Sequence, residues 1–547
     1  MKNTFSLIIF TLVSILSFSQ NGTLEQSIIL GRPTQNSITV NILFSENATC
    51  YLQYGTQSAT YTQSAIPFNI SADTPKVLLI DGLTKNKKYF YKLNYTLAGT
   101  SNNLSTPEYT FQTQRDTNTT FSFTIEADEH LYDRSMGSGN LYKINLSNQK
   151  KDNPDFMISL GDIFGDDNRP TSTTSDNMKS YHKYYRQYLG DICHSVPFFL
   201  ALGNHEGEKS FYLHQNPPNN IATWATLWRK YYYNNPFGTF NFYSGNTSTE
   251  NYGIGNPENY YSWVWGDALF VVLDIYRYQS DSTARPTAWA WTLGRTQYDW
   301  LKQTLESNHS KYKFVFAHHS NGEERGGINS AKLFAWGGYE RNGNYTLNNK
   351  RPGWSKPVHQ LFVDNRVNIF FQGHDHLFAK EVLDGVVYQE VPMAADSTYT
   401  SGMNMFSYAY TLDTLKGSGH LKVTVSPSCI NVKYIRAYLP ADTLNGIQKN
   451  GETAFTYTIG NCILPPPVDT VLNDDVKIFP NPSQDHITIS FSNTPNVFST
   501  QLYNNTGQII YKGNSKNIDT RNFSSGLYYL KINLDDIQLI RKIIICH

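Results

Sequence analysis

The chain has 547 residues, and its 45 Lys and Arg residues balance 45 Asp and Glu residues. This length exceeds a single hydrophobic core and predicts roughly two to four domains. The zero net charge argues against a nucleic-acid partner or an anionic membrane surface, and a charged content of only 16% with 38 Tyr residues is typical of an exported, β-rich protein.

The first residues have the pattern of an export signal. Met1-Lys2-Asn3 is followed by a mostly apolar run from Phe5 to Leu16 and by small residues up to Ser19. This run is shorter than the roughly 20 apolar residues that span a bilayer, which argues against a membrane anchor. We therefore predict a signal peptide over residues 1–19 and no membrane span in the rest of the chain.

Five cysteines are scattered along the chain, at Cys50, Cys193, Cys429, Cys462 and Cys546. No two have C-x-x-C spacing, so the sequence predicts neither a zinc ribbon nor a dense disulfide framework. The odd number leaves at least one thiol unpaired. Cys429 and Cys462 flank the predicted closing strands of one domain and are candidates for a bridge.

Residues 20–116 have the pattern of a β-sandwich. Short runs with apolar residues at every second position, such as 37–44 and 50–54, are separated by polar turns. The stretch from Asp81 to Tyr91 resembles the corner of a fibronectin type III module. We expect a fibronectin III-like sandwich without a catalytic site here.

Residues 117–462 alternate strands with helices. Between two apolar strands lies a helical stripe, Met178, Tyr181, Tyr185, Tyr188 and Leu189. A second helix is predicted from Thr296 to Ser307, with Thr296 and Asp299 capping its start. This alternation predicts a layered α/β (α+β) domain whose sheets are flanked by helices.

The last part of the chain forms a separate module. Three consecutive prolines, from Pro465 to Pro467, predict a linker over 463–474. Residues 475–547 return to short strands and turns, which predict a C-terminal β-sandwich. Its Pro-Asn-Pro start (480–482) and its Gly-x-Tyr-x-x-Lys finish (526–531) resemble the C-terminal sorting domain of the bacterial type IX secretion system. The resemblance implies the type IX machinery as a partner and a secreted or cell-surface location; the alternative is a plain β-sandwich module.

Five polar clusters share one position, because each begins where an apolar strand ends. They are Asp128-Glu129-His130, Gly161-Asp162, Gly203-Asn204-His205-Glu206, His318-His319 and Gly373-His374-Asp375-His376. The carboxyl ends of strands form the ligand crevice in layered α/β proteins, so these clusters are expected to converge.

Spacing within the clusters adds a second expectation. Residues two apart in an extended chain point to the same side, which predicts that Asp128 acts with His130 and that His374 acts with His376. Adjacent residues diverge, so Asn204 and His205 should have different roles. Each cluster alone is weak, but their combination in one order is specific.

The order Asp-x-His, Gly-Asp, Gly-Asn-His-Glu, Val-x-x-His and Gly-His-x-His resembles the calcineurin-like metallophosphoesterase family over about residues 120–440. The resemblance implies a dinuclear site with one metal on Asp128, His130 and His376, the other on Asn204, His318 and His374, and Asp162 bridging both. It also implies that His205 is the catalytic histidine that binds no metal.

The residue types suit that chemistry. Carboxylates, imidazoles and an amide without a thiolate favour Zn, Mn or Fe. Two such ions lower the pKa of a bridging water, and the hydroxide attacks phosphorus in line while His205 stabilises charge or protonates the leaving group. The expected enzyme is a secreted hydrolase of small-molecule phosphomonoesters or phosphodiesters.

The preceding β-sandwich makes the arrangement resemble purple acid phosphatases in particular. However, those enzymes have Gly where this chain has His130, and a metal-binding Tyr where this chain has Gly165. These departures put the purple iron site and the acid optimum in doubt, so the broader family is the firmer expectation.

Two other functions stay open from the sequence. One is an inactive surface binding or adhesion module on a phosphoesterase fold, and the other is an exported nuclease with the same metal core, which would need a basic groove. Glu206, His319 and Asp375 beside the predicted ligands either support the site or fix loops. The aromatic insertion from Trp224 to Tyr261 either lines a cleft or packs in the core.

Overall fold

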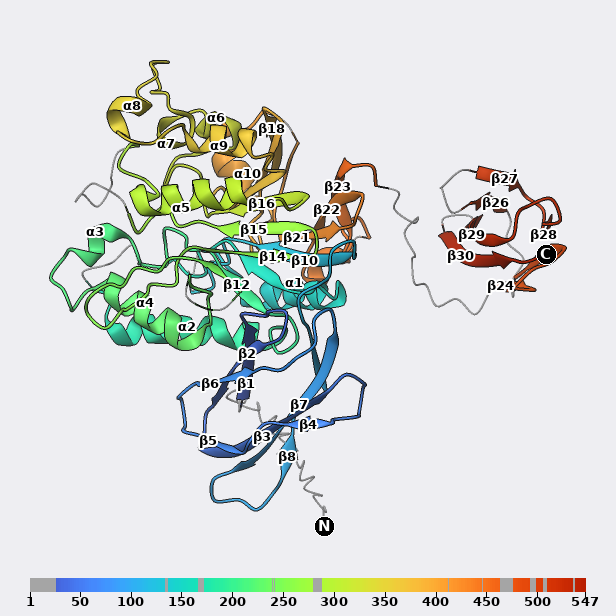
Figure 1. Ribbon diagram of the computed structural model, residues 1–547, viewed down its shortest axis with the longest axis horizontal. Helices are drawn as coiled ribbons and strands as arrows, with labels where there is room; N and C mark the ends of the chain where they lie inside the picture. The colour runs from blue at the N-terminus through green and yellow to red at the C-terminus, as the bar shows by residue number, and fades with distance from the viewer. Residues whose placement is uncertain are drawn as a thin grey trace, which may run out of the picture. The chain divides into compact units, whose positions relative to one another are not determined.

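The computed structural model describes residues 26–132, 136–165, 172–238, 240, 242–278, 288–411, 413–444, 446–462, 476–491, 498–504, 509–534 and 537–547. The predicted signal peptide (1–19) and linker (463–474) lie outside these residues. The chain forms two compact units, a large one up to residue 427 with 431–457, and a small one of residues 428–430 and from 458 onward (Figure 1). Within the described ranges, none of the helices has the length and apolar character that crossing a bilayer requires.

The large unit begins with two antiparallel sheets. One contains β1 (Gln26–Gly31), β2 (Ile38–Phe44) and β6 (Lys76–Ile80), and the other contains β3 (Ala48–Gly55), β4 (Gln63–Ser64), β5 (Phe68–Ile70), β7 (Lys88–Leu97), β8 (Leu104–Ser105) and β9 (Tyr109–Gln112). Both sheets contribute to one buried apolar cluster that includes Val40, Leu52 and Tyr91. This arrangement agrees with the predicted β-sandwich, while the fibronectin likeness stays a prediction.

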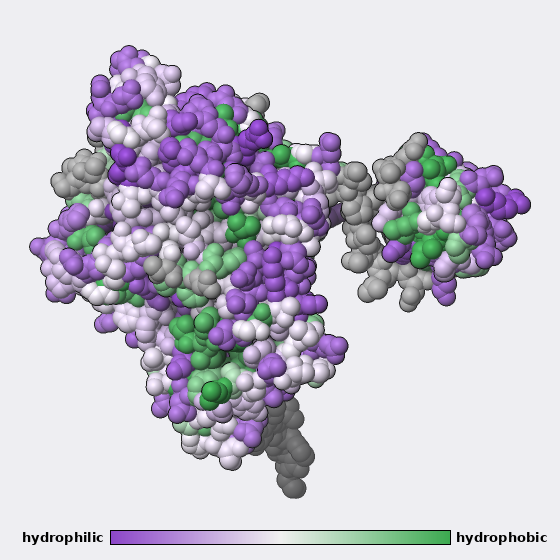
Figure 2. All heavy atoms as spheres, viewed as in Figure 1, coloured by the Kyte–Doolittle hydropathy of each residue, from purple (hydrophilic) through white to green (hydrophobic). Residues whose placement is uncertain are grey.

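Not all of the sandwich's apolar residues are buried. Val77 and Leu79 on β6 are 49% and 55% exposed. Figure 2 shows hydrophobic residues gathered on the surface over β2 and β6. Scattered exposed apolar side chains are ordinary on soluble proteins.

Two mixed sheets follow the sandwich. The first has the order β12-β11-β10-β21-β22-β23, and the second has the order β13-β14-β15-β16-β17-β19-β18-β20. The first comprises β10 (Phe121–Glu126), β11 (Met157–Ser159), β12 (Phe198–Leu200), β21 (Gly419–Val425), β22 (Cys429–Arg436) and β23 (Thr453–Gly460). The second comprises β13 (Ser244–Gly245), β14 (Tyr261–Trp265), β15 (Ala268–Val272), β16 (Tyr312–Phe316), β17 (Ile369–Gln372), β18 (Phe378–Leu383), β19 (Val386–Glu390) and β20 (Thr414–Leu415).

Aromatic side chains fill the space between these two sheets. The Phe123 ring on β10 lies 5.0 Å from that of Phe270 on β15 and 5.5 Å from that of Phe314 on β16. These edge-to-face and tilted contacts bury large apolar areas on both inner faces. The sheets therefore pack directly on each other.

Helices cover the outer faces. The longer ones are α1 (Gly139–Lys151), α2 (Ser175–Leu189), α4 (Ile221–Tyr232), α5 (Gly294–Ser307) and α9 (Val358–Asp364); shorter turns are α3 (Ser210–Leu213), α6 (Ile328–Ala331), α7 (Phe334–Gly337), α8 (Leu347–Lys350), α10 (Ser401–Phe406), η2 (Ser407–Ala409) and η3 (Pro440–Thr443). Residues of α1, α2 and α4 share one core cluster with β11 and β12, and residues of α5 and α9 share another with β15, β16 and β17 (Figure 1). The predicted layering of helices on sheets is thus confirmed.

Helix α2 bears out its predicted apolar stripe, whereas the predicted start of α5 is wrong. All five stripe residues of α2 are buried. Helix α5 begins at Gly294 instead of Thr296, and its first residues make no side-chain cap. Asp299 pairs with Arg295 one turn earlier on the helix, so its carboxylate is not available to cap the helix.

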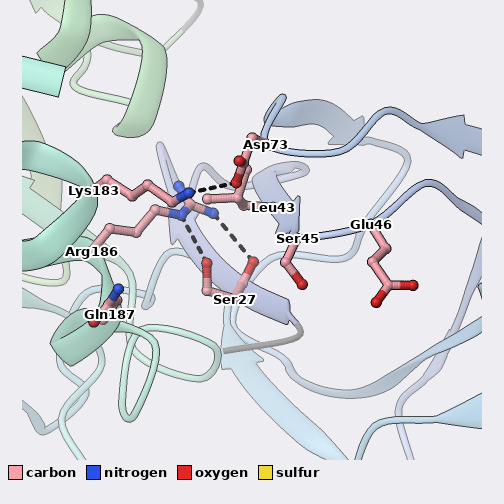
Figure 3. A pocket seen from close by; sticks show the side chains of 8 residues that line it. All are labelled: Ser27, Leu43, Ser45, Glu46, Asp73, Lys183, Arg186 and Gln187. Atoms are coloured by element: carbon pink, nitrogen blue, oxygen red, sulfur yellow. Dashed lines mark hydrogen bonds and ion pairs between the residues drawn. The ribbon is translucent and has the colours of Figure 1, made fainter. Parts of the chain in front are cut away.

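A buried arginine joins the sandwich to α2. Arg186 donates from Nε to Ser27 Oγ (2.9 Å) and from Nη2 to Ser27 O (3.2 Å) and Asn41 O (3.0 Å). Beside it, a pocket of about 350 Å³ is lined by Ser27, Leu43, Ser45, Glu46, Asp73, Lys183, Arg186 and Gln187 (Figure 3). Lys183 is already paired with Asp73, and Arg186 is already bonded to backbone oxygens. We interpret this seam as structural.

The small unit is a second pair of antiparallel sheets. One contains β24 (Val476–Phe479), β25 (His486–Phe491) and β28 (Asn517–Asp519), and the other contains β26 (Phe498–Tyr503), β27 (Ile509–Gly513), β29 (Gly526–Leu534) and β30 (Ile537–Ile545). They share one buried cluster, which includes Ile489 and Leu530. The candidate bridge between Cys429 and Cys462 is present as a disulfide, with a Cα–Cα distance of 4.9 Å.

Candidate metal centre

The predicted metal-binding residues follow the ends of strands in both mixed sheets. Asp128 follows β10, Asp162 follows β11 and Asn204 follows β12, and these three strands are parallel neighbours. His318 follows β16 and the Gly373–His376 loop follows β17, which is parallel to β16. Parallel neighbours end at one edge of a sheet, so each sheet brings its residues to one place.

Asp128, His130 and His376 form one buried group. His376 Nε2 lies 3.4 Å from Asp128 Oδ1 and 3.2 Å from His130 Nε2, and His130 Nε2 lies 4.0 Å from Asp128 Oδ1. One possible ligand atom from each residue lies within 4.8 Å of the others. This spacing and these donors suit a transition-metal ion.

Asp162, His318 and His374 form a second buried group next to the first. His318 Nε2 lies 3.0 Å from Asp162 Oδ2 and 3.2 Å from His374 Nδ1. Asp162 Oδ2 also lies 3.9 Å from His130 Nε2 in the first group. One carboxylate oxygen therefore faces both groups.

Two further atoms are candidate ligands. Asn204 Oδ1 is buried and has no hydrogen-bond partner among the described residues. His318 Nδ1 lies 2.9 Å from the Leu160 carbonyl, which can only accept a hydrogen bond. Burial lowers the pKa of His318, but Asp162 and Asp128 raise it to about 9, so the ring is protonated at neutral pH in the metal-free protein; a bound ion would replace the proton on Nε2, the atom beside Asp162.

The backbone at the site is unusual. Asp128, His130, Asp162, His374 and His376 all have positive φ angles, of 55°, 43°, 57°, 79° and 60°. This left-handed region is uncommon for residues other than glycine and clusters at functional sites. The expectation that His374 acts with His376 is wrong, since these two histidines fall in different groups; positive φ does not decide this alone, because Asp128 and His130 have it too. Asp128 and His130 do share a group.

Electrostatics keep the two aspartates ionised. Burial alone would raise the pKa of Asp162, but the adjacent His318 and His205 imidazoles lower that pKa well below its usual value. The pKa of Asp128 is likewise lowered, because His376 and His318 outweigh its burial. Burial and the neighbouring His376 lower the pKa of His130 to about 3. Ionised carboxylates beside a neutral imidazole are the forms that bind metal ions.

Comparison with known proteins identifies the domain. Residues 122–378 match the family model of calcineurin-like phosphoesterases. The chain contains a calcineurin-like phosphoesterase domain. Residues 477–546 match the model of a secretion system C-terminal sorting domain, which implies type IX sorting and a secreted or cell-surface location. A search of curated proteins gave no match.

Solved structures share the fold of this phosphoesterase. A purple acid phosphatase from yellow lupin (Lupinus luteus) seeds aligns with a TM-score of 0.53 and 15% identity, covering 79% of this chain and 74% of the plant chain. The structure of PhoD aligns with a TM-score of 0.56 and 14% identity, covering 79% of this chain and 90% of its own. At these identities the likeness concerns the fold alone.

His205 lies at the edge of the candidate metal centre. Its backbone amide donates to Asp162 Oδ1 (2.8 Å), and its Nε2 lies 4.0 Å from Asp162 Oδ2. Its side chain is 19% exposed, whereas those of His130 and His318 are 2% and 0% exposed. His205 is therefore the histidine that a molecule arriving from solvent can reach.

The acidic neighbours of the predicted ligands fix loops of the phosphoesterase domain. Glu206 accepts the backbone amides of Ile163 (2.9 Å) and Gly203, which links the loops after β11 and β12. Burial and the nearby Asp162 raise the pKa of Glu206 to about 8. Asp375 accepts the amide of Gly326 (2.8 Å). Both side chains are buried, so the loop-fixing alternative fits them better than contact with substrate.

The sequence did not single out a polar cluster behind the Gly373–His376 loop. Arg325 Nη1 donates to His374 O (2.8 Å) and to Asp375 Oδ1 (2.9 Å). Tyr410 OH lies 2.8 Å from Asp375 Oδ2 and 3.0 Å from Glu390 Oε2. No motif or spacing connects these residues, so only the folded chain reveals that they position the loop.

The aromatic insertion from Trp224 to Tyr261 packs in the interior. Tyr232, Tyr233, Tyr243 and Tyr261 are all buried. Tyr233 belongs to the core cluster of α2 and α4. These side chains therefore support the core-packing alternative.

Proposed function

We propose that this chain is a secreted hydrolase of small-molecule phosphomonoesters or phosphodiesters that works with two metal ions. The observation that supports it best is the pair of buried triads with one oxygen of Asp162 between them, 3.0 Å from His318 and 3.9 Å from His130. A shared carboxylate between two donor sets is the arrangement that a two-metal phosphoesterase requires.

The donor atoms suggest the assignment. Asp128, His130 and His376 would hold one ion, and Asn204, His318 and His374 the other, with Asp162 in contact with both. Nitrogen and oxygen donors without thiolate suit Zn, Mn or Fe. The buried and otherwise unpartnered Asn204 Oδ1 supports its inclusion.

When bound, such ions neutralise phosphate charge and lower the pKa of a coordinated water to near 7. To His205 we assign the donation of a hydrogen bond to a phosphoryl oxygen or of a proton to the leaving alcohol, and its position as a partly exposed imidazole beside Asp162 supports this role. Its amide bond to Asp162 Oδ1 orients that carboxylate.

The alternatives lack such support. Loss of catalysis would leave ligand positions replaced, whereas all seven predicted ligands are present and six of them form the two triads. The balanced net charge gives no support to a nuclease.

Metal content and turnover should be measured together on purified protein. We expect Asp162→Ala and His374→Ala to lose bound metal, seen by mass spectrometry, together with hydrolysis of p-nitrophenyl mono- and diesters. His205→Ala should keep the metal and lose rate by about 100-fold or more. The exposed His309 gives a matched control, and His309→Ala should change neither quantity. Wild-type turnover in all three site variants would refute the proposal.

A further inference from the structure

Residues 401–410, here called the rim segment, run from α10 through η2 to Tyr410 and are fixed at both ends to the metal loop. A Cβ on Gly402 would lie 2.4 Å from the carbonyl carbon of His376, so this approach requires glycine. At the other end Tyr410 OH contacts Asp375 Oδ2 at 2.8 Å. The rim segment therefore holds a defined position beside the loop that carries two of the predicted ligands.

Between its fixed ends the rim segment exposes apolar side chains. Met405 is 51% exposed and Tyr408 is 77% exposed. Phe406 between them is half-buried, and its ring lies 6.2 Å from the His376 ring. Isolated apolar residues on a surface need no explanation, but three neighbours beside a buried metal site indicate a binding surface.

Arg325 holds the Phe406 ring in place. Its guanidinium carbon lies 4.0 Å from the ring centroid, while Nη1 is bonded to His374 O and Asp375 Oδ1. A cation over an aromatic face stabilises both groups. The ring is thus oriented relative to the metal loop.

A further exposed aromatic side chain follows the loop after β10, which carries Asp128 and His130. Tyr132 comes two residues after His130 and is 40% exposed, and its ring lies 4.4 Å from that of Tyr181. The ligand loops after β10 and β17 therefore each have an aromatic neighbour at the surface.

We infer that the rim segment binds the alcohol part of the substrate, and that this part is aromatic, so that the enzyme prefers phosphate esters of aromatic alcohols. The inference rests on the proposed function. A phosphate held by the two triads would leave its ester group facing solvent, and the rim segment is an exposed apolar stretch attached to the loop that carries His374 and His376. These side chains are aromatic or thioether, and such groups add specific contacts with planar rings beyond the area that they bury.

Three esters distinguish the possible alcohol parts. We would measure kcat/KM for 2-naphthyl phosphate, n-octyl phosphate and glycerol 2-phosphate with the wild type, Met405→Ala and Tyr408→Ala. Each ester is compared with itself across variants, so its intrinsic reactivity cancels. Both side chains are largely exposed, so truncation spares the core. Tyr51→Ala, which removes a 40% exposed tyrosine from the distant β3, is the matched control.

The expected result is a loss of about 3- to 10-fold for 2-naphthyl phosphate in each rim variant, with glycerol 2-phosphate changing less than about twofold. Metal content should stay at the wild-type level, and Tyr51→Ala should match the wild type. Equal losses on 2-naphthyl phosphate and glycerol 2-phosphate would overturn the inference. A loss on n-octyl phosphate that equals or exceeds the loss on 2-naphthyl phosphate would show that the rim segment binds aliphatic chains, and it would overturn the inference too.

Failure of the proposed function would look different. The wild type would then cleave none of these three monoesters and neither the p-nitrophenyl mono- nor diesters. Equilibrium dialysis with 2-naphthyl phosphate would still test the rim, because the inference requires weaker binding by Tyr408→Ala than by the wild type. Equal binding by both proteins would overturn it.

Discussion

His182 gives a sharp test of how burial couples the fold to pH. It lies on α2 and is fully buried, with its ring 5.1 Å from Phe164 and 5.6 Å from Tyr233. Burial lowers the pKa of His182 from 6.5 to about 3; the charge of Glu208 opposes this shift and that of Arg229 adds to it. The folded protein therefore carries this histidine as the neutral imidazole.

The free energy of unfolding falls with decreasing pH because the folded and unfolded states differ in the pKa of His182. The unfolded chain binds a proton at His182 near pH 6.5 and the folded chain does not, so stability falls as pH drops below 6.5 and continues to fall to about pH 3. The full difference is about 5 kcal/mol at 1.36 kcal/mol per pKa unit. Between about pH 7.5 and about pH 5 the contribution is about 2 kcal/mol.

The test compares the wild type with His182→Phe, which keeps an aromatic ring but cannot titrate. All nine tryptophans lie between Trp224 and Trp354, so tryptophan fluorescence during urea unfolding reports on the phosphoesterase domain. When the pH is lowered from about 7.5 to about 5, we expect the free energy of unfolding to fall by about 2 kcal/mol less in His182→Phe than in the wild type. His309→Phe, at an exposed position, should behave like the wild type. Identical losses in His182→Phe and the wild type would refute the reasoning.

Three further changes test other features. Gly402→Ala should reduce bound metal and turnover severalfold, because the new methyl group would displace the His376 backbone; wild-type metal content would contradict this. Arg186→Met should lower the free energy of unfolding, measured in urea titrations, by about 3 kcal/mol, because it leaves the buried carbonyl groups of Ser27 and Asn41 unpaired. An unchanged urea midpoint would contradict the proposed structural role of Arg186. Cys429→Ser should lower the melting temperature, with turnover unchanged, because it opens a 33-residue loop whose closure contributes about 4 kcal/mol. An unaltered melting temperature would show that the bridge contributes little.

The sequence predicts features that depend on local periodicity or on residue order. The stripe of α2 follows from the helical spacing of its apolar residues, and the strands before Asp128, Asp162 and His318 follow from apolar runs of three to six residues. The structure has these elements where the sequence predicts them. The convergence of the clusters follows from the parallel order of the strands. These features need no knowledge of distant contacts.

Other features depend on contacts that no pattern encodes. Tyr410 supports Asp375 from 35 residues away, and Arg325 reaches the same loop from 50 residues before it. The left-handed φ angles of His374 and His376 are imposed by the tertiary structure, because an isolated histidine would prefer the extended or helical region. The predicted start of α5 is wrong because Asp299 pairs with Arg295 instead of capping the helix.

The strained backbone at the metal centre needs a compensating source of stability, because each left-handed residue costs about 1 kcal/mol or more. The hydrogen bonds between β10 and β11 supply part of it by continuing past the ends of both strands: Asp128 N donates to Gly161 O (3.0 Å), and His130 N donates to Asp162 O (3.1 Å). His374 N then donates to Asp128 Oδ2 (2.9 Å), which joins the loops of the two sheets. These bonds hold four of the five strained residues by a neighbouring loop, and Tyr410 holds the loop of His374 and His376 through Asp375. The contacts of Gly402 and Tyr410 both shape the metal site and fix the rim segment beside it. A change at these two residues should therefore affect metal binding, whereas a change at the exposed Met405 or Tyr408 should affect only which ester is preferred.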